Sequence, residues 1–188
     1  VDNQNRVGVP VYRVDDKGVK TNSRLGYSKD CSLAMRIHYF YNQAITNKFY
    51  PLKDARNDIA KININGKERD FIVRIETGTI NRFIYGIATL KGESDVIDKP
   101  DLRDWNGVLV YQFKGGVGIG FDQGKMKIRK LLKYRREQLA KGYAVAYSTG
   151  NATDNHYNVW LQEDTAMRVK KQFETAYAKP RYTVGIGG

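Results

Sequence analysis

The chain has 188 residues, with 32 Lys or Arg against 20 Asp or Glu, so its formal net charge is +12 at pH 7. Its 41% hydrophobic and 28% charged residues are the balance of a globular domain and exclude a disordered polyelectrolyte. No stretch approaches about 18 uninterrupted apolar residues, so we expect no membrane span. A single cysteine, Cys31, excludes an internal disulfide framework and a cysteine-rich zinc site. The two histidines, His38 and His156, are far apart in sequence, so we expect neither a metal nor another cofactor.

The N-terminal half predicts β structure. Residues 1–30 are polar and contain several glycines, and we expect an N-terminal arm with one edge strand at 9–14. Residues 31–92 are expected to form an antiparallel β region, because alternating apolar segments follow one another closely and Asn65-Gly66 is a strong hairpin turn signal. Its expected strands cover residues 34–41, 61–66, 67–75 and 82–90.

An acidic connection follows at residues 91–106. It carries Gly92, Pro100 and five carboxylates at positions 93, 95, 98, 101 and 104. Calcium loops place their ligands on a tight alternating pattern with a turn glycine, and Pro100 interrupts any such pattern here. We therefore expect a solvated acidic loop.

The segment 93–188 is expected to form the N-terminal half of an α/β core. Continuous apolar strands alternate with helix-forming stretches, which is typical of a parallel sheet with right-handed crossovers. Gly142 is expected to end the first helix, and Pro180 follows the second. The expected order is strand 107–113, helix 128–141, strand 143–148, helix 160–177 and strand 182–186.

A glycine loop at residues 114–125 lies between the first of these strands and the helix that follows it. It does not match the phosphate-binding pattern of nucleoside triphosphatases, because Ile119 and Met126 occupy the positions that require glycine and Ser or Thr. It does not match the dinucleotide fingerprint either, because Phe121 replaces the third glycine. Two interpretations stay open: a tight turn, or a loop whose backbone N–H groups stabilise an anion.

The last strand runs into Gly187-Gly188, which also has two interpretations. It can be an ordinary turn, or the start of a nucleophile elbow, in which glycines flank a serine on a strained strand-to-helix turn.

Several segments in sequence order resemble a bacterial family of α/β-hydrolase-like proteins of unknown function, similar in layout to the tannase/feruloyl esterase group. The resemblance covers about residues 31–188, and its segments lie at 39–41, 72–90, 105–113, 115–124, 142–145, 163–167 and 180–185. In that family the last strand continues into Gly-x-Gly-Gly-Ser-Gly-Gly, so Gly185, Gly187 and Gly188 match the residues before the nucleophile. The serine itself would follow Gly188.

The resemblance implies a serine hydrolase, with ester bonds as the first expectation and amides as the second. In this fold the order Ser, Asp or Glu, His places the whole triad beyond Gly188. Gly116 and Val117 would supply the backbone donors of the oxyanion hole, and Asn155 and His156 would lie at the edge of the substrate pocket. We expect another polypeptide to complete the sheet.

That partner would begin with the serine if the chain is cut after Gly188. Self-cleavage by the serine, another protease, or a boundary set in preparing the chain would each produce this end. The absence of methionine at position 1 fits a periplasmic or secreted protein whose export signal was removed, but trimming of a cytoplasmic protein would look the same.

The competing function is a non-catalytic basic module that binds nucleic acid or another anionic polymer. Its support is a cluster of Lys and Arg at positions 125–136. No nucleic-acid module pattern accompanies the cluster, and the aromatic residues are not interleaved with it, so a solvated helix face is expected and nucleic acid is not.

Overall fold

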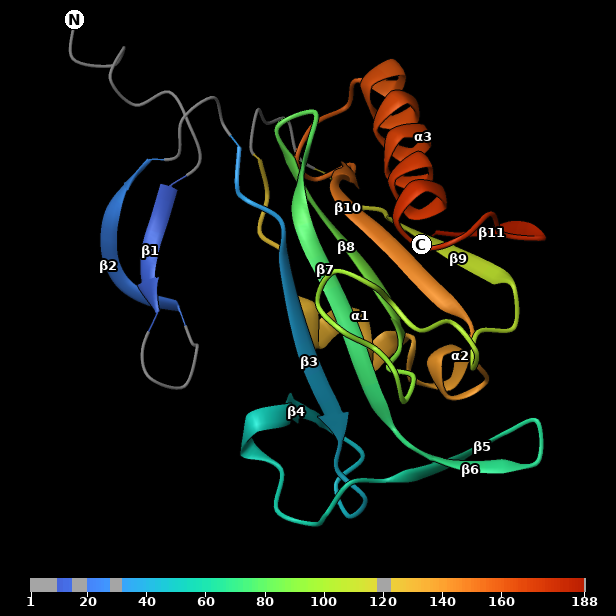
Figure 1. Ribbon diagram of the computed structural model, residues 1–188. Coiled ribbons are helices and arrows are strands. Elements are labelled where there is room, and N and C mark those ends of the chain that lie inside the picture. The colour runs from blue at the N-terminus through green and yellow to red at the C-terminus, as the bar shows by residue number, and fades with distance from the viewer. Residues whose placement is uncertain (1–9, 15–19, 28–31, 118–122, 188) are drawn as a thin grey trace, which may run out of the picture.

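The computed structural model describes residues 10–14, 20–27, 32–117 and 123–187 (Figure 1). Seven strands form one mixed sheet in the order β11-β9-β10-β8-β7-β3-β4. Their bounds are β3 Arg36–Asn42, β4 Phe49–Pro51, β7 Ile72–Ile80, β8 Phe83–Leu90, β9 Val108–Lys114, β10 Ala144–Ala152 and β11 Tyr182–Ile186. The layout is of the α/β type, with a parallel and an antiparallel half.

The antiparallel half contains β4, β3, β7 and β8, each paired antiparallel with its neighbour. Two hairpins form separate sheets: β1 (Pro10–Val14) with β2 (Lys20–Tyr27), and β5 (Lys61–Ile64) with β6 (Lys67–Asp70). A short 3-10 helix, η3 (Leu52–Asp54), follows β4.

The predicted turn at Asn65-Gly66 is confirmed, because both residues adopt positive φ values, 51° and 78°. The single strand expected at 67–75 was wrong. The fully buried Phe71 separates β6 from β7. Its N–H donates to the carbonyl of Ala60, the residue before β5, and its carbonyl accepts from the N–H of Asn42 on β3, so Phe71 links the hairpin to the large sheet.

The parallel half confirms the predicted alternation of strands and helices. β9 pairs parallel with both β10 and β11. Between β9 and β10 the chain forms α1 (Ile128–Tyr134) and α2 (Arg136–Ala140), and between β10 and β11 it forms α3 (Val159–Ala176). None of the described helices is long and apolar enough to cross a membrane.

The single helix expected at 128–141 is therefore two short helices that meet at Arg135. The Arg135 side chain donates from Nε to Oε1 of Gln112 on β9 at 3.0 Å, which ties this junction to the sheet. Gly142 ends α2 as predicted, with φ of +79°. A Cβ at this position would lie 2.6 Å from the carbonyl oxygen of Asp104, so only glycine fits.

The helices cover opposite faces of the sheet (Figure 1). On one face, Leu131, Leu132 and Leu139 of α1 and α2 pack against β7, β8, β9 and β10. On the other, Val169 and Phe173 of α3 pack against β8, β9 and β10. The two apolar clusters explain why these strands lack a polar alternation: both of their faces are buried.

β11 lies at the edge of the described sheet and pairs there with β9 alone. No described strand pairs with its other edge, and the expectation that another polypeptide completes the sheet stays a prediction. Tyr182 and Val184 are exposed on it, by 56% and 40%.

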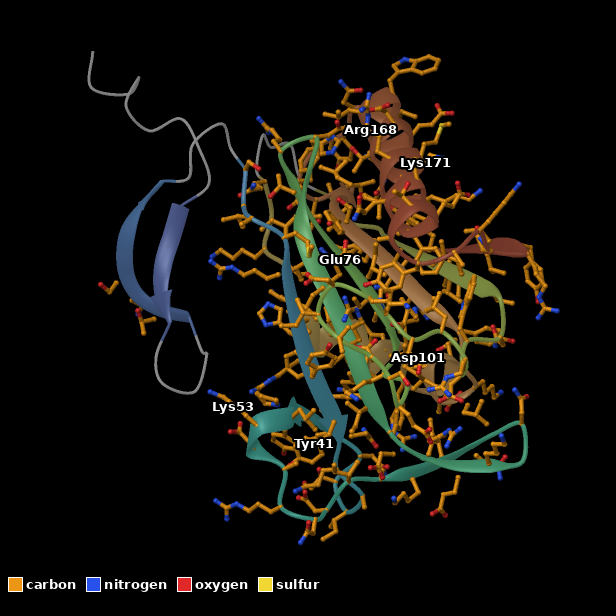
Figure 2. The ribbon with its side chains drawn as sticks, viewed as in Figure 1. Tyr41, Lys53, Glu76, Asp101, Arg168 and Lys171 are labelled. Carbon is orange, nitrogen blue, oxygen red and sulfur yellow. The ribbon has the colours of Figure 1, made fainter. Side chains whose placement is uncertain are left out.

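The acidic connection is the solvated loop that we expected only in part: Glu93 and Asp98 are exposed, but Asp95 is not. Asp95 is buried, and its Oδ1 lies 3.0 Å from Nη1 of Arg74, which is itself buried on β7. The same guanidinium donates to the carbonyls of Val96 and Ile97, and the hydroxyl of Tyr39 donates to Asp95 at 2.6 Å. The loop is therefore fixed onto the α3 side of the sheet, where Figure 2 shows Glu76 on β7.

Candidate functional site

The carboxyl ends of β9, β10 and β11 lie at one edge of the sheet because the three strands are parallel. The chain leaving β9 crosses the face covered by α1 and α2, whereas the chain leaving β10 crosses the face covered by α3. In α/β proteins, ligands bind at the carboxyl ends of adjacent strands whose connections diverge in this way. Residues 114–117 of the glycine loop lie at this edge, directly at the end of β9.

β10 reaches this edge of the sheet through an irregularity in its pairing with β9. Tyr147 pairs with Gln112 in regular register, but the next pair is Ala152 with Lys114. Five positions along β10 thus correspond to two along β9, which defines a large bulge at residues 148–151. Bulges are frequent next to active sites because they redirect the side chains that follow.

Hydrogen bonds hold the backbone of this bulge in place. The Asn155 side chain donates from Nδ2 to the carbonyl of Thr149 at 2.7 Å. The ring of His156 donates from Nε2 to the carbonyl of Gly150 at 2.8 Å. The hydroxyl of Tyr111 donates to Oδ1 of Asn151 at 2.7 Å. Each residue from 149 to 151 is therefore fixed by a side chain from elsewhere in the fold.

His156 is a buried support of the bulge. Its Nε2 carries the proton because a carbonyl can only accept, which leaves Nδ1 to accept from the N–H of Asn158 at 3.2 Å. The ring also stacks on Phe83, with centroids 4.8 Å apart. Both ring nitrogens of His156 are therefore hydrogen-bonded within the protein.

We expect His156→Ala to lower the free energy of unfolding by about 1–3 kcal/mol, because a buried carbonyl loses its donor. Urea denaturation of the chain measures this loss. His38→Ala, at a half-buried position on β3 remote from the bulge, is the matched control and should cost less than about 1 kcal/mol. If His156→Ala unfolds at the same midpoint urea concentration as the wild type, His156 does not support the bulge.

The bulge places Thr153 and Asp154 against the glycine loop. The hydroxyl of Thr153 donates to the carbonyl of Gly116 at 2.8 Å, and its N–H donates to the carbonyl of Lys114 at 3.0 Å. The ammonium of Lys114 forms an ion pair with the carboxylate of Asp154. A Cβ at Gly116 would lie 2.9 Å from Cβ of Asp154, and its φ of +156° is one that L side chains rarely adopt. Gly116 is therefore required for this close approach.

Burial raises the pKa of two tyrosines on these strands, Tyr111 on β9 and Tyr147 on β10. Burial raises the pKa of Tyr147 to about 12, and the negative charge of Asp154 adds to the effect. Burial also raises the pKa of Tyr111 well above its usual value. Both hydroxyls stay protonated at neutral pH, and that of Tyr111 acts as a hydrogen-bond donor.

The residues predicted for the site lie around this edge. Val117, next to Gly116, is 98% exposed. Gly187 follows β11, and a Cβ there would make only an ordinary contact with Phe113, at 3.8 Å. Gly188 lies outside the described residues.

Sequence reasoning missed Thr153, Asp154 and Lys114. Their signal was weak: a polar run directly after a buried strand, at the end of the sheet where ligands bind. No three His, Cys, Asp or Glu side chains gather into a possible metal site in the part of the chain that the structure describes.

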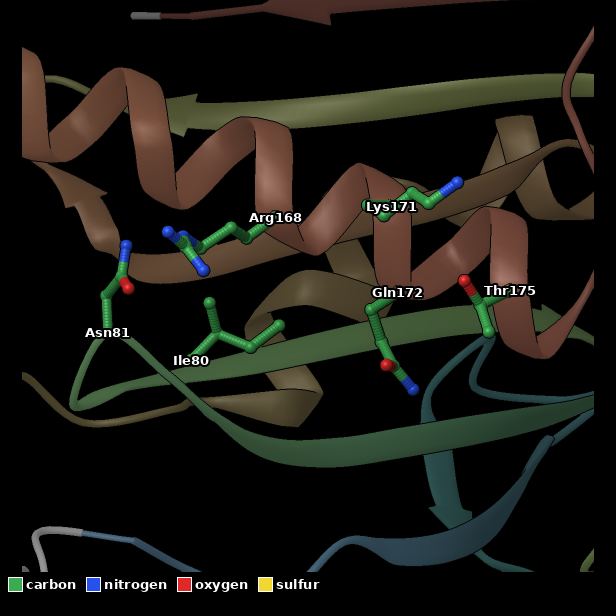
Figure 3. Close-up of a pocket in the computed structure, with 6 residues that line it drawn as sticks. All are labelled: Ile80, Asn81, Arg168, Lys171, Gln172 and Thr175. Atoms are coloured by element: carbon green, nitrogen blue, oxygen red, sulfur yellow. The ribbon is translucent and has the colours of Figure 1, made fainter.

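A concavity lies between α3 and the turn joining β7 to β8 (Figure 3). It has a volume of about 370 Å³ and is lined by Ile80, Asn81, Arg168, Lys171, Gln172 and Thr175. Nε of Arg168 already binds the carboxylate of Asp164 at 2.7 Å, and Nδ2 of Asn81 binds the same carboxylate at 2.6 Å. We take the edge where β9 and β10 end as the candidate site, because α/β proteins bind ligands where the connections of adjacent parallel strands diverge.

The fold defines the class: an α/β protein whose glycine loop begins at the carboxyl end of a parallel strand. The sequence profile of a tannase-like family of unknown function, DUF6351, matches residues 14–188. The chain therefore belongs to this family. Searches of curated proteins and of solved structures gave no match.

Proposed function

We propose that the chain is the N-terminal part of a serine hydrolase that cleaves carboxylic esters. The observation that carries the proposal is that the carboxyl ends of β9 and β11 lie side by side. Ile186 pairs with Gln112, so the chain leaving β11 and the Gly116 loop leaving β9 start from the same edge, on adjacent strands. Adjacent strands are about 4.8 Å apart, which brings an elbow after β11 within reach of that loop. The tannase-like family supports an esterase-like activity.

In the proposed reaction a serine that follows Gly188 attacks the ester carbonyl carbon while a base takes its proton. The carbonyl oxygen becomes an oxyanion, held by the backbone N–H groups of Gly116 and Val117. Collapse of this intermediate releases the alcohol with a proton returned by the base, and water then hydrolyses the acyl-serine to the acid. Ester bonds are the proposed substrates, and amides are the alternative.

The catalytic acid and base are proposed to lie beyond Gly188, as the chain order of the triad in this fold requires. The positions of the two histidines support this assignment. His38 is on β3, separated from β9 by β7, β8 and β10. His156 is buried with its ring nitrogens bonded to the protein. Asn155 and the exposed end of this loop are proposed to border the substrate.

A second polypeptide beginning with serine is part of the proposal. The edge of β11 that does not face β9 offers backbone groups on which the next strand can pair. In one route the serine hydroxyl attacks the Gly188 carbonyl and displaces its own amine, and water hydrolyses the resulting ester. Cleavage by another protease would leave the same two chains.

Two arginines of the basic cluster are bound within the fold and do not support the basic-module alternative. Arg135 donates to Gln112 on β9, and Nη2 of Arg136 donates to Oδ1 of Asn42 and Asn47, at 3.1 and 2.6 Å. These two guanidinium groups serve the fold and are not free to follow a phosphate backbone.

A fluorophosphonate probe separates the two functions, applied to the gene product expressed at its full natural length. We expect covalent labelling, hydrolysis of p-nitrophenyl acetate, and loss of both after heat denaturation. Absence of labelling together with DNA binding that falls steeply with salt would overturn the hydrolase and favour the basic module.

A further inference from the structure

We infer that Thr153 is a positioning residue that aims the oxyanion donor of the glycine loop. The inference rests on the proposed function and adds a residue that no sequence motif identified. Its basis is the hydrogen bond from Oγ1 of Thr153 to the carbonyl oxygen of Gly116, at 2.8 Å.

This bond fixes the direction of the Val117 N–H. The carbonyl of Gly116 and the N–H of Val117 belong to the same peptide group, and the described residues contain no cis peptide bond. In a trans peptide the C=O and N–H point in opposite directions. Because the carbonyl points at Thr153, the N–H points away from the end of β10, and Val117 itself is exposed.

Thr153 is itself held firmly enough to act in this way. Its N–H donates to the carbonyl of Lys114, the last residue of β9, so its backbone is joined to the strand that carries the loop. The ion pair between Lys114 and Asp154 joins the same two strand ends a second time. The bulge of β10, fixed by Asn155 and His156, sets the register that brings Thr153 to this place.

The ion pair between Lys114 and Asp154 also neutralises a negative charge beside the glycine loop. The carboxylate of Asp154 lies next to Gly116, where a free negative charge would oppose a developing oxyanion. The ammonium of Lys114 compensates it. Thr153 contributes a neutral donor, so it can hold the peptide without adding charge. An oxyanion donor displaced by about 1 Å can cost about 10²-fold in rate.

The test compares Thr153→Val with Thr153→Ser in the full-length protein. Valine keeps the shape of threonine and removes the donor, whereas serine keeps the donor. We expect Thr153→Val to lower the rate constant of fluorophosphonate labelling and the kcat for p-nitrophenyl acetate by about 10–100-fold, with KM changed by less than about threefold. Thr153→Ser should stay within about threefold of wild type. Thr175→Val, on the exposed side of α3, is the control and should behave as wild type.

The outcomes distinguish this inference from the proposed function. Wild-type protein that is labelled, together with Thr153→Val labelled equally fast, would overturn the positioning role and leave the hydrolase standing. Equal losses in the Val and Ser variants would also overturn it, because the hydroxyl would then not matter. Wild-type protein that is never labelled would overturn the proposed function and this inference together.

Discussion

Gly116→Ala is expected to lower the rate of fluorophosphonate labelling of the full-length protein by about 10²–10³-fold, the effect of removing one oxyanion donor. The added Cβ would lie 2.9 Å from Cβ of Asp154, a distance that real Cβ atoms essentially never show. The loop or the end of β10 must therefore move. Either shift breaks the bond from Thr153 to the Gly116 carbonyl and turns the Val117 N–H away from the reacting oxygen. Labelling kinetics at several probe concentrations measure the loss.

Gly66→Ala is the matched control. Gly66 has φ of +78°, so alanine there meets backbone strain, but nothing lies within 4 Å of the added Cβ and the hairpin of β5 and β6 is a separate sheet. We expect a stability loss of about 1 kcal/mol and wild-type labelling. Wild-type labelling of Gly116→Ala at unchanged melting temperature would show that this loop does not hold the oxyanion.

Arg74→Met is expected to lower the free energy of unfolding by about 3–5 kcal/mol, because it leaves the carboxylate of Asp95 buried without its cation. The side chains of Arg74 and Asp95 are 3% and 0% exposed, so water cannot replace the lost partner. The carbonyls of Val96 and Ile97 also lose their donors. Urea denaturation of the isolated chain measures the change.

Arg168→Met provides the comparison for an ion pair that is exposed on both sides. Nε of Arg168 lies 2.7 Å from the carboxylate of Asp164, and the two side chains are 61% and 48% exposed, so we expect a loss below about 1 kcal/mol. The double variant Arg74→Met, Asp95→Leu removes both buried charges and should recover part of the stability lost in Arg74→Met. Equal losses for Arg74→Met and Arg168→Met would contradict the idea that Arg74 fixes the acidic loop.

The parallel half was predictable because its signals are local. β11 covers residues 182–186 as predicted, and α3 lies within one residue of the predicted 160–177 at each end. Thr165, Val169 and Phe173, spaced four residues apart along α3, are buried. Each strand and helix of this half can be located from a few neighbouring residues, because a continuous apolar stretch marks the strand and glycine or proline marks its boundary.

The features that sequence reasoning missed depend on distant partners. The break between α1 and α2 occurs without proline or glycine, at an arginine bound to Gln112 on β9. Asp95 of the acidic loop is buried because it meets Arg74, which lies more than twenty residues earlier in the chain. The bulge of β10 exists only relative to the register of β9. The sequence could suggest Gly116 as a site residue because it follows a strand. Thr153 could not be suggested, because its place beside Gly116 depends on the register of β10 against β9.

The central claim is that the glycine loop of this chain serves a serine that follows Gly188. Mass spectrometry of peptides from the fluorophosphonate-labelled full-length protein tests it most directly. We expect the label on a serine in the position directly after Gly188, either within one polypeptide or at the N-terminus of a second one. A label on any residue among 1–188, or on a serine elsewhere in the protein, would contradict the claim.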